Sequence, residues 1–203
     1  IPTIALVGYT NAGKSTLLNT LSGADALAEN KLFATLDPLT RRADLNGQEV
    51  LLTDTVGFVQ KLPHELVDAF RSTLEEAVHA DLLLHVVDAS HREKERQMEV
   101  VDEVLHQLNA HTIPRIVVYN KADIAGFEAP KGAVAISAKN GQGLEPLFAC
   151  IQDRLSESWW QGSLLIPYHR GDLAAQIRAC GTILNETYLQ EGTEIVCKLP
   201  KAK

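Results

Sequence analysis

The sequence predicts an α/β protein: a six-stranded, mostly parallel sheet with helices on both faces, followed by a small C-terminal β-α-β appendage. Short apolar or β-branched runs alternate with longer amphipathic stretches over residues 1–155. Two of these runs, 82–87 and 116–119, are apolar on both faces, as expected of strands that helices cover on both sides. The pattern changes after Ser158, where Trp159-Trp160 precedes a shorter set of elements.

The elements of the larger part follow from these patterns. Strands are expected at residues 2–7, 42–45, 49–54, 81–88, 115–120 and 133–137. Helices are expected at residues 13–22, 63–80, 91–110 and 144–158. Asn46-Gly47 is a hairpin signal, so the second and third strands should be antiparallel neighbours. The segment 28–40 has no clear period and is long for a connection, which indicates a functional loop.

Two domains are expected, at residues 1–158 and 159–203. In the second, strands at 164–167 and 193–199 flank a helix at 172–185. A unit of this size is marginal for folding alone, so it should pack on the first domain. The paired tryptophans favour packing at that junction over base stacking.

Composition narrows the class of protein. The chain has 203 residues, 45% of them hydrophobic and 22% charged, which is typical of an ordinary globular protein. No apolar run approaches the ~18 residues of a membrane span, and the N-terminus lacks an export signal, so we expect a cytoplasmic protein without membrane insertion. The three cysteines are far apart and the histidines lack ligand spacing, which argues against a disulfide framework or a zinc site. The net charge of −7 predicts weak direct binding to nucleic acid.

The strongest motif is residues 8–15, GYTNAGKS, which matches the phosphate loop pattern G-x-x-x-x-G-K-[ST] between a strand and a helix. Its glycines let successive backbone N–H groups and the helix N-terminus point at phosphate oxygens. Lys14 is then expected to neutralise the β- and γ-phosphates, and the Ser15 hydroxyl to bind Mg²⁺.

A second motif, Asp54-Thr55-Val56-Gly57, ends the third predicted strand. A carboxylate at that position lies beside a phosphate loop, where Asp54 could hold Mg²⁺ through water. Gly57 has no Cβ, so its N–H can approach a γ-phosphate closely. The motif is weak alone and gains its weight from following a phosphate loop.

Two further motifs concern the base. The Asp123 carboxylate of the run 120–123, NKAD, can accept hydrogen bonds from N1–H and the exocyclic amine of guanine, which adenine cannot offer. Lys121 would lie over the ring, and Asn120 would tie this loop to the phosphate loop. The run 137–139, SAK, ends another strand, where a backbone N–H can reach guanine O6.

In this order, the four motifs resemble those of Ras-type P-loop GTPases of the translation-factor class. The runs 8–16, GYTNAGKST, 33–38, FATLDP, and 54–59, DTVGFV, with 62–67, LPHELV, look like the HflX family of bacterial GTPases. The resemblance covers nearly the whole chain and lacks the family's N-terminal domain. It implies association with the large ribosomal subunit, mainly through that missing part, and a role in splitting or rescuing stalled ribosomes.

The resemblance also implies that Thr35 completes the Mg²⁺ shell in the GTP state, with Thr40 as the competing candidate. The expected metal ligands are then Ser15, Thr35 and Asp54, and the expected catalytic residues are Asn11, Lys14, Thr35 and Gly57. The expected GTP contacts are Gly8, Tyr9, Thr10, Asn11, Ala12, Gly13, Lys14, Ser15, Thr16, Phe33, Ala34, Thr35, Asp54, Thr55, Val56, Gly57, Asn120, Lys121, Ala122, Asp123, Ser137, Ala138 and Lys139.

One departure concerns catalysis. Phe58 stands where Ras-type enzymes place the glutamine that orients the attacking water, so we expect slow intrinsic turnover. Asn11 resembles the asparagine that holds K⁺ in some GTPases without that glutamine, which makes K⁺ a candidate cofactor beside Mg²⁺. Arg41, Arg42 and Arg71 are conceivable arginine fingers but fit surface or ion-pair roles better.

The sequence therefore predicts a monomeric, Mg²⁺-dependent protein that binds GTP and GDP and hydrolyses GTP. One alternative is a nucleotide-sensing module with little hydrolysis of its own, in which Phe58 marks lost catalysis. A second alternative, a P-loop kinase, leaves the run 120–123 without a role.

Overall fold

The computed structural model describes residues 1–23, 39–55, 57, 78–157 and 159–200. The chain divides into two compact units, Ile1–Gln152 and Asp153–Lys203, which are described separately below. None of the helices in the described ranges is both long and apolar enough to cross a membrane.

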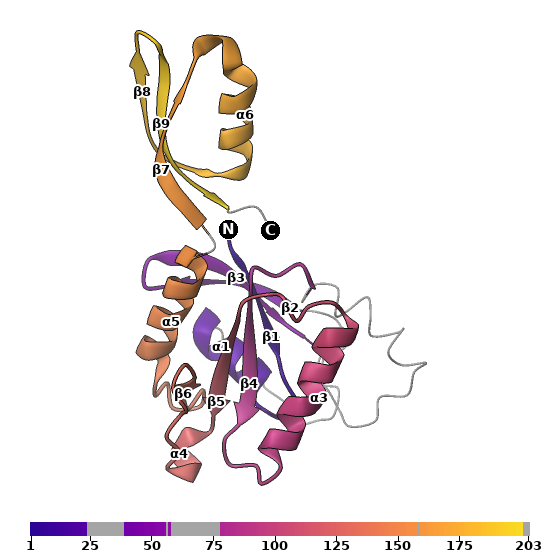
Figure 1. Ribbon diagram of the computed structural model, residues 1–203. Coiled ribbons are helices and arrows are strands. Elements are labelled where there is room, and N and C mark those ends of the chain that lie inside the picture. Colours follow the sequence, from indigo (N-terminus) through magenta and orange to yellow (C-terminus); the bar gives the residue numbers. More distant parts are fainter. Residues whose placement is uncertain (24–38, 56, 58–77, 158, 201–203) are drawn as a thin grey trace. The chain divides into compact units, whose positions relative to one another are not determined.

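The first unit is built on a six-stranded sheet with the order β2-β3-β1-β4-β5-β6 (Figure 1). Its strands are β1 Thr3–Val7, β2 Leu39–Leu45, β3 Gln48–Asp54, β4 Leu82–Asp88, β5 Arg115–Asn120 and β6 Val134–Ala135. Only the β2–β3 pair is antiparallel, joined at the Asn46-Gly47 turn, and the other neighbouring pairs are parallel. The predicted sheet is confirmed.

Helices lie on both faces of this sheet. The described helices are α1 Lys14–Ser22, α3 Lys94–Gln107, the one-turn α4 Ala122–Ala125 and α5 Leu144–Glu157. Figure 1 shows α3 in front of the sheet and α1 behind it. On the α3 face, Ala5, Val7 and Leu83 form a buried cluster with Val101 and Leu105. The 3.6-residue spacing of the helix and the two-residue alternation of the strands supply these matching apolar faces.

Several element boundaries differ from those predicted; β7 (Trp159–Ile166), for example, begins at Trp159 instead of Leu164, and α3 ends at Gln107 instead of Ala110. β2 begins at Leu39, inside the predicted loop, because its register with β3 continues to the pair Leu39–Asp54. α3 begins at Lys94 instead of His91, since Asp88 first closes a turn by accepting a hydrogen bond from the Ser90 N–H at 3.0 Å. The last predicted strand is shorter because Ser137 leaves the sheet to bridge Gln142. The predicted helix at 63–80 lies almost wholly outside the described residues.

The second unit holds one strand more than predicted. It contains β7 Trp159–Ile166, a 3-10 turn η1 Tyr168–Arg170, α6 Gly171–Cys180, β8 Thr182–Leu189 and β9 Gly192–Pro200. The three strands form an antiparallel sheet with the order β7-β9-β8. Ile177 of α6 belongs to a buried cluster with Ile166, Ile195 and Cys197 from this sheet.

The predicted helix at 172–185 is thus wrong in its second half. The chain is extended at Gly181, and residues 182–189 pair with β9. The β-branched Thr182 and Ile183 directly after a glycine were a strand signal. The unit is therefore β-α-β-β.

Candidate functional site

The phosphate loop connects β1 to α1 and depends on two glycines at its ends. Gly13 has a φ of 98°, and a Cβ there would lie 2.2 Å from the side-chain nitrogen of Asn120. At Gly8 (φ 155°), a Cβ would lie 2.3 Å from the carbonyl oxygen of Val86 in β4. Both positions therefore exclude any side chain, which keeps the loop tight at the carboxyl ends of the strands. That geometry leaves the α1 N-terminus open to an anion.

Lys14 lies inside this loop. Its Nζ donates to the carbonyl oxygens of Gly8 at 3.1 Å and Tyr9 at 3.2 Å, and only 6% of the residue is exposed. Burial lowers the pKa of Lys14 to about 8, although the nearby Asp54 carboxylate acts in the opposite direction. A buried ammonium at a helix N-terminus is a strong attractor for phosphate.

Ser15 and Asp54 meet beside the loop. The Ser15 hydroxyl donates to Asp54 Oδ2 at 2.5 Å, and Asp54 is 1% exposed at the end of β3. A hydroxyl and a carboxylate are hard oxygen donors of the kind that Mg²⁺ takes together with phosphate oxygens and water. The donor set therefore fits the predicted metal, with Ser15 as ligand and Asp54 directly behind it.

Two more residues of the second motif, Thr55 and Gly57, follow the end of β3 and lie beside β1 and the phosphate loop. The Thr55 hydroxyl donates to the Leu6 carbonyl at 2.6 Å, which ties the segment to β1. A Cβ on Gly57 would lie 2.9 Å from Thr10 Cα and 3.2 Å from Lys14 Nζ. Gly57 thus lies against the loop at a distance that only a glycine permits.

Asn120 joins two loops that are far apart in the sequence. Its Nδ2 donates to the Ala12 carbonyl at 2.9 Å, and its Oδ1 accepts from the Ala138 N–H at 2.9 Å. The residue is 3% exposed. The link between this loop and the phosphate loop is the one the sequence predicts, and the second bond adds the loop at 137–139.

Two residues that the sequence analysis did not identify, Asp88 and Asn140, form hydrogen bonds with Lys121 and Asp123. Asp88 Oδ2 accepts from Lys121 Nζ at 2.6 Å, and Asn140 Nδ2 donates to Asp123 Oδ2 at 3.1 Å. Asp88 could have been found, because it is a carboxylate at the end of a buried apolar strand, as Asp54 is. Asn140 has no comparable signal in the sequence.

Predicted residues of all four motifs therefore gather at one edge of the sheet, at the carboxyl ends of β1, β3, β5 and β6. Of the expected GTP contacts that the structure describes, Asp123 and Lys139 are exposed to solvent. The predicted contacts that lie outside the described residues are Phe33, Ala34, Thr35 and Val56, together with Phe58 and the finger candidate Arg71.

The remaining candidates have other partners. The Thr40 hydroxyl shares a 2.9 Å hydrogen bond with Thr53 in the β2–β3 pair, and Thr35 lies outside the described residues. Arg41 donates to Asn19 at 2.9 Å, and Arg42 forms an exposed ion pair with Glu49 at 2.9 Å. Both arginines therefore have structural partners on the β2 side of the unit.

Comparison with known proteins gives the class of this site. Residues 3–121 match the family model described as 50S ribosome-binding GTPase. A GTP-binding protein from the hyperthermophilic archaeon Sulfolobus solfataricus, solved in complex with GDP, is 27% identical with a TM-score of 0.62, over 77% of this chain and 53% of that one. A variant of Era from Aquifex aeolicus, solved bound to GDP.AlF4-, is 27% identical with a TM-score of 0.58, over 76% of this chain and 56% of that one. The fold and the site are those of a P-loop GTPase.

The curated relatives narrow the family. GTPase HflX from Caldanaerobacter subterraneus is 47% identical over 98% of this chain, and GTPase HflX from Escherichia coli K12 is 41% identical over 95% of it. The chain belongs to the HflX family of GTPases. It spans about half the length of the curated relatives it matches, 48% in both of these cases.

Proposed function

We propose that this chain binds GTP with Mg²⁺, hydrolyses it slowly to GDP and phosphate, and changes conformation with the nucleotide state. The observation that carries the proposal is the double hydrogen bond of Asn120, which holds the phosphate loop and the base loops in one rigid frame. The proposed domains are a G domain at 1–158 and a small α/β domain at 159–203.

The base is recognised by the loops after β5 and β6. In this proposal Asp123 accepts from guanine N1–H and from the exocyclic amine, and a backbone N–H of the run 137–139 donates to O6. Asn140 already orients one Asp123 oxygen, so part of the ordering cost is met before binding. A site built on such hydrogen bonds can reject adenine by ~10⁴-fold or more.

Hydrolysis is direct attack of water on the γ-phosphorus, with cleavage of its bond to the β–γ bridging oxygen. We expect the Lys14 ammonium and the Gly57 N–H to stabilise charge on the γ-phosphoryl oxygens, and the close approach of Gly57 to Lys14 supports this. Mg²⁺, when bound, neutralises charge on the β- and γ-phosphates. Ser15 and Thr35 would hold it directly, and Asp54 through water.

Fast hydrolysis requires a contribution from a partner or from K⁺, because the four motifs lack a residue that orients the attacking water. Phe58 cannot hydrogen-bond the attacking water, so unassisted turnover should fall in the ~10⁻⁴ to 10⁻² s⁻¹ range of G domains without a partner. Asn11 is exposed at the phosphate loop, which suits a K⁺ ligand that supplies positive charge in the transition state.

The proposed partner is the large ribosomal subunit, in accordance with the description of the matching family. The role is splitting or rescue of stalled ribosomes in the cytoplasm. Contact is made mainly through regions of the full-length relatives that this chain does not span. With a net charge of −7, the chain alone is expected to be a monomer that binds RNA weakly.

Phe58 also favours one alternative, a nucleotide sensor without hydrolysis of its own. GTP turnover in Na⁺ and in K⁺ buffer, with and without large ribosomal subunits, separates the two. Turnover that rises with subunits or with K⁺ supports the GTPase, and tight GTP binding without turnover under any condition supports the sensor.

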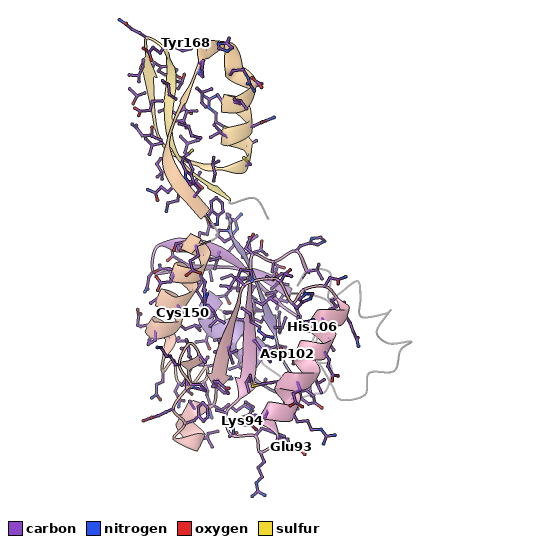
Figure 2. All side chains as sticks on the ribbon, viewed as in Figure 1. Glu93, Lys94, Asp102, His106, Cys150 and Tyr168 are labelled. Atoms are coloured by element: carbon purple, nitrogen blue, oxygen red, sulfur yellow. The ribbon has the colours of Figure 1, made fainter. Side chains whose placement is uncertain are left out.

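Base recognition is tested in parallel. Asp123→Asn should shift the preference from GTP to XTP, because the amide presents a donor where xanthine has an acceptor. Asp102→Asn is a matched control, since Asp102 lies in the second half of α3 (Figure 2). Its partner there is Arg115. Preference for ATP over GTP in the unaltered protein would contradict the proposal.

A further inference from the structure

A short polar chain connects the end of β4 to the base loop and the phosphate loop. Lys121 Nζ donates to Asp88 Oδ2 at 2.6 Å and to the Asn11 carbonyl at 3.0 Å. The side chains of this ion pair are 34% exposed for Lys121 and 14% for Asp88. One ammonium group therefore contacts both the end of β4 and the phosphate loop.

Asp88 is itself held in place. Its Oδ1 accepts from the N–H of Ser90 at 3.0 Å and from the Ser90 hydroxyl at 2.6 Å. The next residue, Ala89, donates its N–H to the Asn120 carbonyl at 2.8 Å, so β4 and β5 stay paired up to the loop. The carboxylate thus has one oxygen fixed by its own turn and the other directed at Lys121.

The charge state of Asp88 suits this arrangement. Burial alone would raise its pKa, but the hydrogen bonds from Lys121 and Ser90 and the lysine's charge outweigh burial, and the pKa lies below its usual value. The Asp88 carboxylate is therefore ionised at neutral pH.

We propose that Asp88 is a positioning residue that sets how long a guanine nucleotide stays bound, by holding the Lys121 side chain extended beneath the plane of the base. This inference rests on the proposed function. A lysine side chain loses rotamer entropy when it is ordered, and the ion pair with Asp88 already holds Lys121 in one geometry. The described side-chain hydrogen bonds of Asp88 are with Lys121 and Ser90 and none is with Asp123, so we expect Asp88 to affect residence time and Asp123 to set base choice.

The test is nucleotide dissociation from Asp88→Asn, followed with a fluorescent GDP analogue by stopped flow. Loss of a charge-assisted hydrogen bond predicts dissociation ~10- to 100-fold faster than from the unaltered protein. Dissociation of GDP and of IDP should accelerate by the same factor, because hypoxanthine lacks only the exocyclic amine that Asp123 is proposed to bind. Asp102→Asn, which removes the ion pair between α3 and Arg115 of β5, should leave dissociation unchanged.

A double-mutant cycle separates positioning from general damage. On a Lys121→Met background, Asp88→Asn should accelerate dissociation no further, since the group it positions is gone. An equal loss on both backgrounds, a change in the GDP to IDP ratio, or unaltered dissociation from Asp88→Asn would overturn the inference. If the unaltered protein fails to bind GDP, the proposed function falls first, and this inference falls with it.

Discussion

The side-chain amide of Asn120 and the backbone carbonyl of Ala12 form a 2.9 Å hydrogen bond across 108 positions of the chain. The other end of the same amide accepts from Ala138, so one buried side chain fixes both loops that flank a nucleotide. Asn120 therefore fixes the relative position of the phosphate loop and the base loop, together with the hydrogen bond from Lys121 to the Asn11 carbonyl.

Replacement of Asn120 gives the first prediction. Asn120→Ala leaves the Ala12 carbonyl and the Ala138 N–H without this partner, and a buried polar group that loses its partner costs ~1–3 kcal/mol. We expect the melting temperature to fall and GDP affinity to drop by ~10-fold or more. Calorimetric titration and thermal unfolding measure both. Asn185→Ala, an exposed position in the second unit, is the control. GDP affinity that matches the unaltered protein would contradict the linking role.

Gly57 gives the second prediction. The Cβ of Gly57→Ala would lie 2.9 Å from Thr10 Cα, so backbone must move on one side or the other. Overpacking of this kind costs ~1–3 kcal/mol, and it falls on the contact proposed for the γ-phosphate. We therefore expect GTP turnover to fall at least ~10-fold, with a smaller loss in GDP affinity. Gly171→Ala, where an added Cβ meets nothing within 4 Å, should leave both unchanged. Equal losses for GTP and GDP would show a general defect of the loop.

Much of the first unit could be predicted, because its signals are local. The order of strands and helices follows from hydrophobic periodicity, and the dipeptide Asn46-Gly47 is sufficient to predict the turn between β2 and β3. The failures have physical causes. Periodicity cannot find α4, which has one turn, and it extended α6 beyond Gly181, where the chain enters a strand.

The candidate site shows the same division. Motif residues are identifiable because the phosphate chemistry restricts their type and spacing. The partners of those residues depend on which strand ends become neighbours. Asp88 and Asn120 are paired in the β4–β5 register, which brings Asp88 close to Lys121. The residues around Lys121 in the sequence do not indicate this partner.

The pKa of Lys14 predicts the third result, a pH dependence of nucleotide binding. Without nucleotide the ammonium loses its proton as the pH rises through about 8. Phosphates favour the charged form, so above this pH binding must take up a proton, and affinity should fall by at most about tenfold per pH unit.

Titration calorimetry in buffers of different ionisation enthalpy measures the proton uptake. Close to one proton should be taken up per GDP at about pH 9, and little of this contribution should remain at about pH 7. Lys14→Arg should remove the dependence, because a guanidinium stays charged throughout this range. Uptake that does not change between these pH values would contradict the assignment.

His85 supports the last prediction. It lies in β4 with 1% exposure, and among the described residues its Nδ1 has no hydrogen-bond partner. Burial, with the nearby positive charge of Arg115, lowers its pKa from 6.5 to about 4, while Asp102 acts in the opposite direction. The imidazole is therefore neutral in the folded protein at neutral pH.

Between pH 6.5 and about 4 the unfolded chain takes up a proton at His85 that the folded protein does not. Stability is therefore lost as the pH falls through that window, by roughly 3 kcal/mol in total. His85→Leu removes both the proton uptake and the unpartnered nitrogen. The free energy of unfolding of this variant minus that of the unaltered protein should therefore be larger at pH 5 than at pH 7. Denaturant unfolding at both pH values measures this, with the exposed His169→Leu as control. A stability difference that is the same at both pH values would contradict the depressed pKa, because protonation is linked to unfolding only where the pKa differs between the folded and unfolded states.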